Sequence, residues 1–175
     1  MATTGWPGTD HLGKKININI FLIYKWENIV KEPIILLVQD NQDHADLMFH
    51  ALDEAGYSQC ILHMKYGEDA LDYLFHRGCY SNAEENPRPA LILLDLGLPK
   101  LSGIEVLKQI KASDELIRIP VVILTCSGSD SNITEAYASH ANGYIVTPMS
   151  FSAFENMANA VISYWMNWNK LPYAV

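Results

Sequence analysis

Residues 35–40, ILLVQD, decide the fold, because they join a continuous apolar run to two polar side chains, Gln39 and Asp40. An apolar run of this kind is typical of a strand that is buried on both faces of a parallel sheet. Residues 91–95, LILLD, repeat the pattern and end on Asp95. Two such strands would bring two carboxylates to the edge of the sheet where open parallel sheets bind their ligands.

Strand-like and helix-like stretches alternate along the chain from residue 33 onward. Crossovers of this length make right-handed βαβ units. The expected fold class is therefore α/β, a doubly wound five-stranded parallel sheet with helices on both faces. The strands are expected at 34–38, 60–64, 90–94, 119–125 and 143–146, and the helices at 42–55, 68–75, 104–110, 131–141 and 151–168.

Length and composition narrow the function classes. A chain of 175 residues suits one domain, and its formal charge of −8 argues against a nucleic-acid surface, which would need a basic patch. The three cysteines show no metal-ligand spacing, which favours reduced thiols and a cytoplasmic protein. No apolar run reaches the roughly 18 residues of a membrane span. The run ININIFLIY at 16–24 lacks the cleavage site of a signal peptide.

The first 32 residues differ in character from the rest of the chain. They begin with a segment rich in Gly and Thr, and residues 16–20 alternate between Ile and Asn. We expect an N-terminal extension at 1–32, either mobile or forming an extra edge strand or an arm that packs on a second subunit. Residues 33–172 are expected to form the folded domain.

Hydroxyl groups complete the polar set at the predicted strand ends, because Thr125 ends the fourth strand and Thr147 follows the fifth. Two neighbouring aspartates repel each other unless a cation or a proton lies between them. A hard cation such as Mg²⁺ prefers one or two carboxylates with water and phosphate. A carboxylate beside such an ion can also attack a phosphoryl group, although a single Asp at a strand end is more often a turn-former or a helix cap.

Four stretches resemble the receiver domain of two-component response regulators: ILLVQDNQDHADLMFHAL (35–52), LILLDLGLPKLSGIEVLKQIK (91–111), IPVVILTCS (119–127) and ANGYIVTPMS (141–150). The resemblance covers about Glu32 to Leu171. The long loop after the second helix and the ending YWMNWNKLP (164–172) are most similar to the stand-alone regulators that accompany bacterial and cyanobacterial phytochromes.

The resemblance implies a flavodoxin-like fold with strand order 2-1-3-4-5. It implies that Asp95 accepts a phosphoryl group from a histidine kinase, including one of the phytochrome photoreceptor type. Mg²⁺ would be held by Asp40, Asp95 and the backbone carbonyl of Gly97. Such a phosphoacceptor is not a conventional enzyme, although it can catalyse its own phosphoryl transfer.

The resemblance also implies a switch. Thr125 would contact the phosphoryl group, and Tyr144 would be the aromatic residue that changes rotamer when Thr125 moves. The peptide bond between Thr147 and Pro148 would be cis, which would orient residue 147 toward the site.

Three positions depart from the family pattern. Gln39 replaces the first of two acids, Thr147 replaces a lysine, and Cys126 replaces a small residue. Losing the charge-assisted hydrogen bond of the lysine costs roughly 1.5–3 kcal/mol. The net charge of the site is unchanged, since an acid and a base are lost together. Gln39 keeps an oxygen that can hold a metal-bound water, so we expect the Mg²⁺ site to survive and the switch to be weakened.

Several functions remain open. The favoured one is a single-domain regulator that acts through protein contacts, since four residues after Leu171 leave no room for an output domain. The alternative is a pseudo-receiver, a binding module that never takes phosphate. A flavoprotein is a third interpretation, although TCSGSDSN (125–132) follows the fourth strand and not the first. Gly97 excludes a dehalogenase-type phosphatase, which needs a second Asp at that position.

The last predicted helix carries apolar side chains on two faces. One face is suited to the core, and a second set lies to its side, composed of Met157, Tyr164 and Trp168. Exposed aromatic patches mark interaction sites. We expect a homodimer through the fourth helix, fifth strand and fifth helix, although the N-terminal segment could cover the same surface. The histidines show no convergent spacing and are expected at the surface or its boundary.

Overall fold

The computed structural model describes residues 33–57 and 60–171, which lie in one compact unit that begins at Pro33. Its sheet has five parallel strands in the order β2-β1-β3-β4-β5, as expected from the family resemblance. The strands are β1 (Ile35–Val38), β2 (Ile61–Met64), β3 (Leu91–Leu94), β4 (Val121–Thr125) and β5 (Gly143–Val146).

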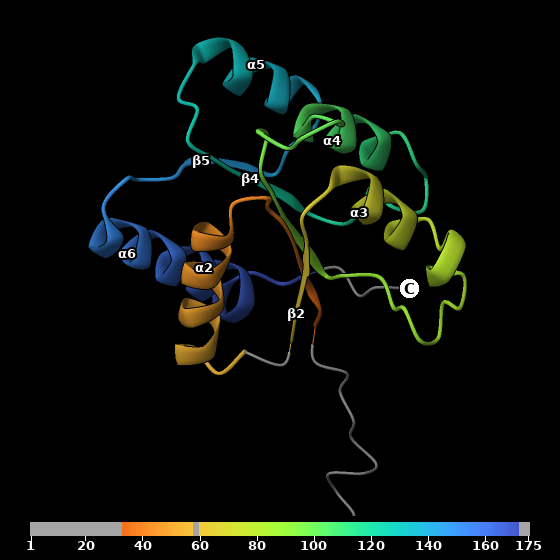
Figure 1. Cartoon of the computed structure of the whole chain (residues 1–175), viewed down its shortest axis with the longest axis horizontal. Coiled ribbons are helices and arrows are strands. Elements are labelled where there is room, and N and C mark those ends of the chain that lie inside the picture. Colours follow the sequence, from red (N-terminus) through yellow and green to blue (C-terminus); the bar gives the residue numbers. More distant parts are fainter. Residues whose placement is uncertain (1–32, 58–59, 172–175) are drawn as a thin grey trace, which may run out of the picture. The chain divides into compact units, whose positions relative to one another are not determined.

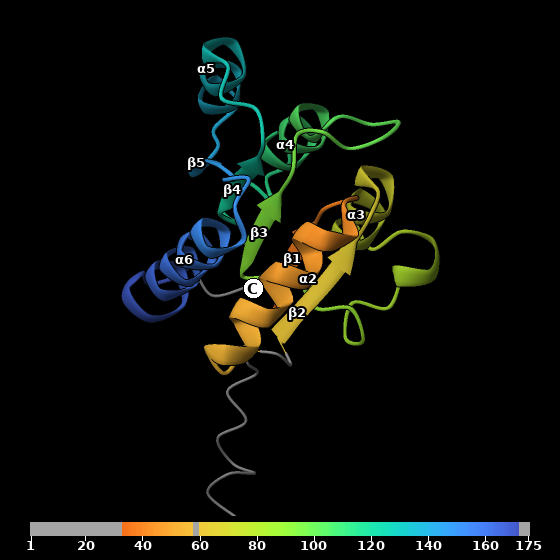
Figure 2. The same cartoon turned by 60° about the vertical axis from the view of Figure 1, so that its left-hand side comes forward.

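Helices cover both faces of this sheet, as Figure 1 and Figure 2 show from two directions. Helices α2 and α6 lie side by side on one face, and α3, α4 and α5 lie on the other. The helices are α2 (Gln42–Glu54), α3 (Gly67–Leu74), α4 (Gly103–Lys111), α5 (Asp130–Ala138) and α6 (Phe151–Ile162). A short 3₁₀ helix spans Gly78–Tyr80, and a π-helix continues α6 over Ser163–Trp168. The predicted α/β architecture is confirmed.

Strands β1 and β3 are apolar at every position because each of their two faces is buried. Alternate side chains of β1, Ile35 and Leu37, pack under α2 and α6, while Leu36 and Val38 pack under α3 and α4. Successive side chains of a strand point to opposite faces, so a continuous apolar run supplies both layers of the core. All four residues of β1 and all four of β3 are buried.

Side-chain caps begin four of the five helices. Asn41, Ser102, Ser129 and Ser150 each accept a hydrogen bond from a backbone N–H in the first turn of the helix that follows. Ser102 and Glu105 form a reciprocal capping box, and these hydrogen bonds lower the pKa of the Glu105 carboxyl. Since α2 and α4 directly follow the loops of β1 and β3, these caps also fix the ends of the loops that carry Asp40 and Asp95.

Some predicted boundaries differ from the structure. Strand β4 begins at Val121 and not at residue 119, because Pro120 has no N–H to donate to the ladder, although its carbonyl accepts from Ile92. Helix α5 ends at Ala138 and not at residue 141, because His140 adopts a positive φ of 64°. Within the described ranges, 33–57 and 60–171, no helix has both the length and the apolar character needed to cross a membrane.

Candidate functional site

The carboxyl ends of neighbouring strands are joined by backbone hydrogen bonds, which place the predicted site residues at one edge of the sheet. The N–H of Asp95 donates to the carbonyl of Val38 at 2.9 Å, so the end of β3 lies beside the end of β1. The N–H of Thr147 donates to the carbonyl of Thr125 at 2.8 Å, which joins β5 to β4. Strand order therefore brings four separate sequence segments to the same edge, where doubly wound sheets bind ligands.

The end of β1 presents one buried amide and one exposed carboxylate. Gln39 is 4% exposed, and its Oε1 accepts from the N–H of Asn41 at 2.9 Å. The carbonyl oxygen of Gln39 lies 2.7 Å from Nε2 of His63, which holds β1 against the end of β2. Asp40 is exposed to solvent. Of the two side chains, only the Asp40 carboxylate is therefore readily accessible to a cation from solution.

Asp95 is half-buried and is oriented by the loop that follows it. Its Oδ1 accepts from the N–H of Gly97 at 3.1 Å. Gly103, the first residue of α4, packs directly behind it, since a Cβ there would lie 2.0 Å from the carbonyl oxygen of Asp95. The loop from Asp95 to Gly103 is thus closed tightly, with the second carboxylate oxygen left without a hydrogen bond to a described residue.

The ends of β4 and β5 carry the two hydroxyl groups, and both are buried. Oγ1 of Thr125 accepts from the N–H of Ser127 at 3.4 Å, which leaves the hydroxyl hydrogen free to donate elsewhere. Oγ1 of Thr147 lies 3.2 Å from Sγ of Cys126. Two of the three departures from the family pattern therefore contact each other, and the Thr147 hydroxyl is engaged by the thiol.

The aromatic ring of Tyr144 reaches the loop after β4. Its hydroxyl donates to the carbonyl of Ser127 at 2.8 Å. Burial raises the pKa of the Tyr144 phenol, and the negative charge of Asp95 acts in the same direction. The Tyr144 hydroxyl therefore holds the backbone of the loop beside Thr125.

One expectation about this edge is wrong. The Thr147–Pro148 peptide bond is trans, like every other peptide bond of the described residues. Trans is the lower-energy isomer of an X-Pro bond, and Thr147 is held by β4 through its own N–H and by Cys126 through its side chain. These contacts orient residue 147 without a cis bond.

The sequence did not indicate several contacts of this edge. Ser127, Asn41 and His63 take part through hydrogen bonds to Tyr144 and Gln39. The ion pairs of the described residues join His50 to Glu54, Arg88 to Glu115, Lys100 to Glu68 and Lys108 to Glu135. Neither Asp40 nor Asp95 is among them, so no lysine of the described residues forms an ion pair with either carboxylate.

Comparison with known proteins places these features in context. Residues 35–159 match the response regulator receiver domain family. A probable methanogenesis regulatory protein, FilR2 of Methanothrix harundinacea, is 43% identical over 140 residues, which cover 79% of this chain and 87% of that protein. Response regulator Rcp1 of Synechocystis is 36% identical over 141 residues, which cover 81% of this chain and 94% of Rcp1.

Solved structures agree with these sequence matches. The phosphorylated cyanobacterial phytochrome response regulator RcpA superposes with a TM-score of 0.77 at 36% identity, covering 81% of this chain and 99% of RcpA. The Mn²⁺-bound form of Rcp1 superposes with a TM-score of 0.74 and the same coverage of both chains. With the family match over most of its length, this chain belongs to the response regulator receiver domain family.

Proposed function

We propose that Asp95 accepts a phosphoryl group from a histidine kinase and that the protein signals by contacts with other proteins. The observation that carries the proposal is the adjacency of two strand ends. The Asp95 N–H bonds to Val38, two residues before Asp40, so two carboxylates project from neighbouring strands at the ligand-binding edge.

The residues at this edge fit a hard divalent cation. The carboxylates of Asp40 and Asp95 and the carbonyl of Gly97 are oxygen ligands of the kind that Mg²⁺ prefers. Gln39 would contribute through a metal-bound water, since an amide oxygen that accepts one hydrogen bond retains a second lone pair. When bound, the ion neutralises charge on the phosphoryl oxygens. The Mn²⁺-bound form of Rcp1 supports a divalent ion in a related protein.

The side chains supply the remaining chemistry. A carboxylate oxygen of Asp95 forms the new P–O bond as the P–N bond of the phosphohistidine donor breaks, and the donor nitrogen keeps the electron pair. The Gly97 N–H holds Oδ1 of Asp95, which orients the other oxygen for attack. Thr125 donates its hydroxyl hydrogen to a phosphoryl oxygen, while Ser127 donates to the Thr125 oxygen from behind.

The switch would pass through Tyr144. Its hydroxyl is bonded to the Ser127 carbonyl, two residues after Thr125. A shift of Thr125 toward the phosphoryl group moves this loop and alters the contact that holds the tyrosine. Thr147 cannot supply the cation of the usual lysine, so we expect the coupling between phosphorylation and the switch to be weaker than in relatives that keep it.

The output surface would be the α5–β5–α6 face. Tyr137 on α5, Val146 at the end of β5, and Phe151 and Trp168 along the last helix are between 48% and 79% exposed. Exposed apolar side chains of this size favour a protein interface. We propose a homodimer through this face, with a histidine kinase as the upstream partner. The similarity to RcpA and Rcp1 favours a kinase of the phytochrome type.

Two observations favour a pseudo-receiver as the second candidate. The Thr147 hydroxyl is engaged by Cys126, and Gln39 is buried with its Oε1 bonded to Asn41. Neither side chain can contribute charge to the site. The family assignment gives no support to the flavoprotein interpretation.

Intact mass separates the two candidates. After incubation with Mg²⁺ and acetyl phosphate, the receiver proposal predicts a gain of one phosphoryl group that needs Mg²⁺ and is absent from Asp95→Asn. Asp43→Asn, which removes an exposed acid from the neighbouring helix, should label like the native chain. Equal labelling of Asp95→Asn would contradict the assignment, and no labelling of the native chain would favour the pseudo-receiver.

A further inference from the structure

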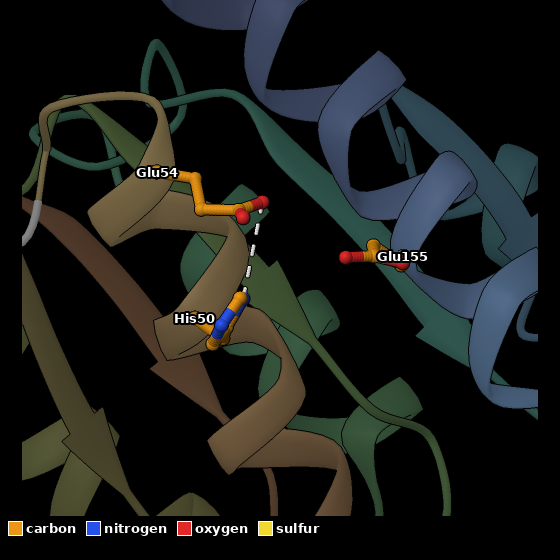
Figure 3. Close-up of side chains that lie close together, drawn as sticks. All are labelled: His50, Glu54 and Glu155. Carbon is orange, nitrogen blue, oxygen red and sulfur yellow. Dashed lines mark ion pairs between the residues drawn. The ribbon is translucent and has the colours of Figure 1, made fainter.

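Three side chains able to bind a metal converge on the outer surface between α2 and α6, which is a different part of the molecule from the Asp95 loop. His50 and Glu54 come from α2, and Glu155 comes from α6. Figure 3 shows Glu155 projecting across from its helix toward the other two side chains. One ligand atom from each residue can be chosen so that all three lie within 4.8 Å of one another.

Core packing fixes this convergence. Residues 50 and 54 are four apart and therefore lie one turn above each other on the same side of α2. Beneath them, Ala51 of α2 and Ala158 of α6 are buried in the same core cluster. The distance between the two helices is therefore set by packing in the core. The three side chains face each other whether or not they interact.

Helices α2 and α6 contribute no permanent cation to this surface. Helices α2 and α6, QDHADLMFHALDE and FSAFENMANAVI, contain neither Lys nor Arg. Glu54 is the last residue of α2, where the helix dipole disfavours a carboxylate. His50 pairs with it, with Nδ1 at 3.8 Å from Oε2, while Glu155 has no ion pair within the described ranges. The cluster therefore contains two carboxylates and one imidazole.

The ligand types indicate which ion would suit this surface. Imidazole and carboxylate together are ligands of Zn²⁺, whereas Mg²⁺ prefers oxygen alone. Tetrahedral Zn²⁺ with bonds of this type places its ligand atoms about 3.4 Å apart. The side chains of His50 and Glu54 are 62% and 52% exposed, so they are free to rotate and close the remaining distance. Water would complete the coordination.

We propose that His50, Glu54 and Glu155 form a site for a divalent transition metal of the Zn²⁺ type, and that the bound ion ties α2 to α6. The site is separate from the proposed Mg²⁺ site, because its ligands come from the middle and end of α2 and from α6. Its effect would be to stabilise the helix pair next to the proposed output face.

Zinc binding to the full chain tests this proposal. The exposed thiols are removed by Cys79→Ser and Cys126→Ser, and excess Mg²⁺ fills the proposed acidic site. Equilibrium dialysis with Zn²⁺ is expected to give one bound ion per chain and a raised midpoint of thermal unfolding. Glu155→Gln should weaken Zn²⁺ binding by more than about tenfold, since even groups behind metal ligands are worth about 10–100-fold. His50→Ala should have a similar effect.

Asp53→Asn is the matched control, because it removes an exposed carboxylate from the same turn of α2 outside the cluster. It should bind Zn²⁺ like the parent chain, and so should Asp95→Asn, which makes the test independent of phosphorylation. The proposal is overturned if the parent chain binds no Zn²⁺, if Glu155→Gln binds as tightly as the parent, or if Asp53→Asn weakens binding equally.

Discussion

At the scale of single residues, Gln39 and Thr147 occupy two positions that are usually charged in receiver domains. Each is engaged by a neighbour here: Gln39 by the N–H of Asn41, and Thr147 by the thiol of Cys126. The two replacements remove one negative and one positive charge from the same small edge of the sheet. The net charge near Asp40 and Asp95 is therefore the same as in the family pattern, although the site has one acid and one lysine fewer.

If the two replacements compensate for each other, the effect of reverting one should depend on whether the other is also reverted. Gln39→Glu alone adds a third acid, so Mg²⁺ should bind more tightly while the anionic phosphoryl donor is repelled. Thr147→Lys alone places an ammonium group beside two acids, where it competes with Mg²⁺. The double variant should label faster than the native chain. Coupling between neighbours that share partners is commonly about 0.5–3 kcal/mol, which initial rates can resolve.

A double-mutant cycle on phosphorylation rate and Mg²⁺ affinity measures this coupling. Thr147→Val serves as a control, since it removes the contact with Cys126 without adding charge. Strictly additive effects would show that the two replacements are independent, and would favour the pseudo-receiver.

Lys111 is a charged residue with a structural role. It is 8% exposed, and its Nζ donates to the carbonyls of Ile117 and Ile119 and to Oδ1 of Asn142. Burial lowers the pKa of its ammonium group from 10.5 to about 8. Between these two pH values the unfolded chain keeps a proton that the folded chain releases. Stability should therefore rise with pH in this window, by up to about 1.4 kcal/mol per pH unit.

Chemical denaturation from pH 7 to pH 9 should show this rise in the native chain and not in Lys111→Met. Above this range tyrosines of the unfolded chain begin to ionise, and because burial raises the pKa values of Tyr73, Tyr80 and Tyr144 in the folded chain, that ionisation would oppose the effect. Lys108→Met, which removes an exposed ammonium from the same helix, should keep the rise. Parallel profiles for the native chain and Lys111→Met would contradict this account of Lys111.

At the scale of elements, the start of α4 determines the shape of the Asp95 loop. Gly103→Ala would place a methyl group 2.0 Å from a backbone oxygen, which neither rotation nor a small shift can relieve. We expect a loss of about 1–3 kcal/mol in unfolding free energy, together with slower phosphorylation because Asp95 is displaced. Gly143→Ala is the control, since its Cβ would meet the nearest atom at 3.5 Å. Equal effects of the two substitutions on phosphorylation would count against a steric role for Gly103.

Strands were the most predictable elements, because burial on both faces requires the continuous apolar runs that the sequence shows at β1 and β3. Helix ends were less predictable. The positive φ of His140 stops α5, and histidine is not an obvious terminator. The last helix was expected to be regular, but residues 163–168 form a π-helix, whose i→i−5 bonds depend on tertiary packing and leave no pattern in the sequence.

The candidate site was predictable only to the level of strand ends. Asp40, Asp95 and Thr125 follow apolar runs, and the parallel order then brings them to one edge. The contacts of Cys126 with Thr147 and of Tyr144 with Ser127 link segments about twenty residues apart, which side-chain packing decides. The expectation of a cis bond at Thr147 came from the family pattern and was wrong, since the Thr147–Pro148 bond is trans.

At the scale of the whole molecule, the α5–β5–α6 face predicts self-association. Val146, at the end of β5, is 48% exposed, and Val146→Glu would place a like charge on both sides of a two-fold interface. We expect a dimer of the native chain at micromolar concentration in sedimentation equilibrium, and a monomer of Val146→Glu. Ile117→Glu is the control, because Ile117 is 46% exposed in the α4–β4 loop. A native chain that is monomeric under these conditions would rule out the dimer.

The central claim is that Asp95 is the phosphoryl acceptor, and borohydride trapping tests it most directly. The native chain is incubated with Mg²⁺ and acetyl phosphate, reduced with borohydride, digested and mapped by mass spectrometry. An aspartyl phosphate is reduced to homoserine, whereas a free carboxylate is not. The account predicts homoserine at position 95, in an amount that follows the phosphoryl gain in intact mass and disappears without Mg²⁺. Homoserine at Asp40 or at another aspartate, with position 95 unchanged, would contradict it.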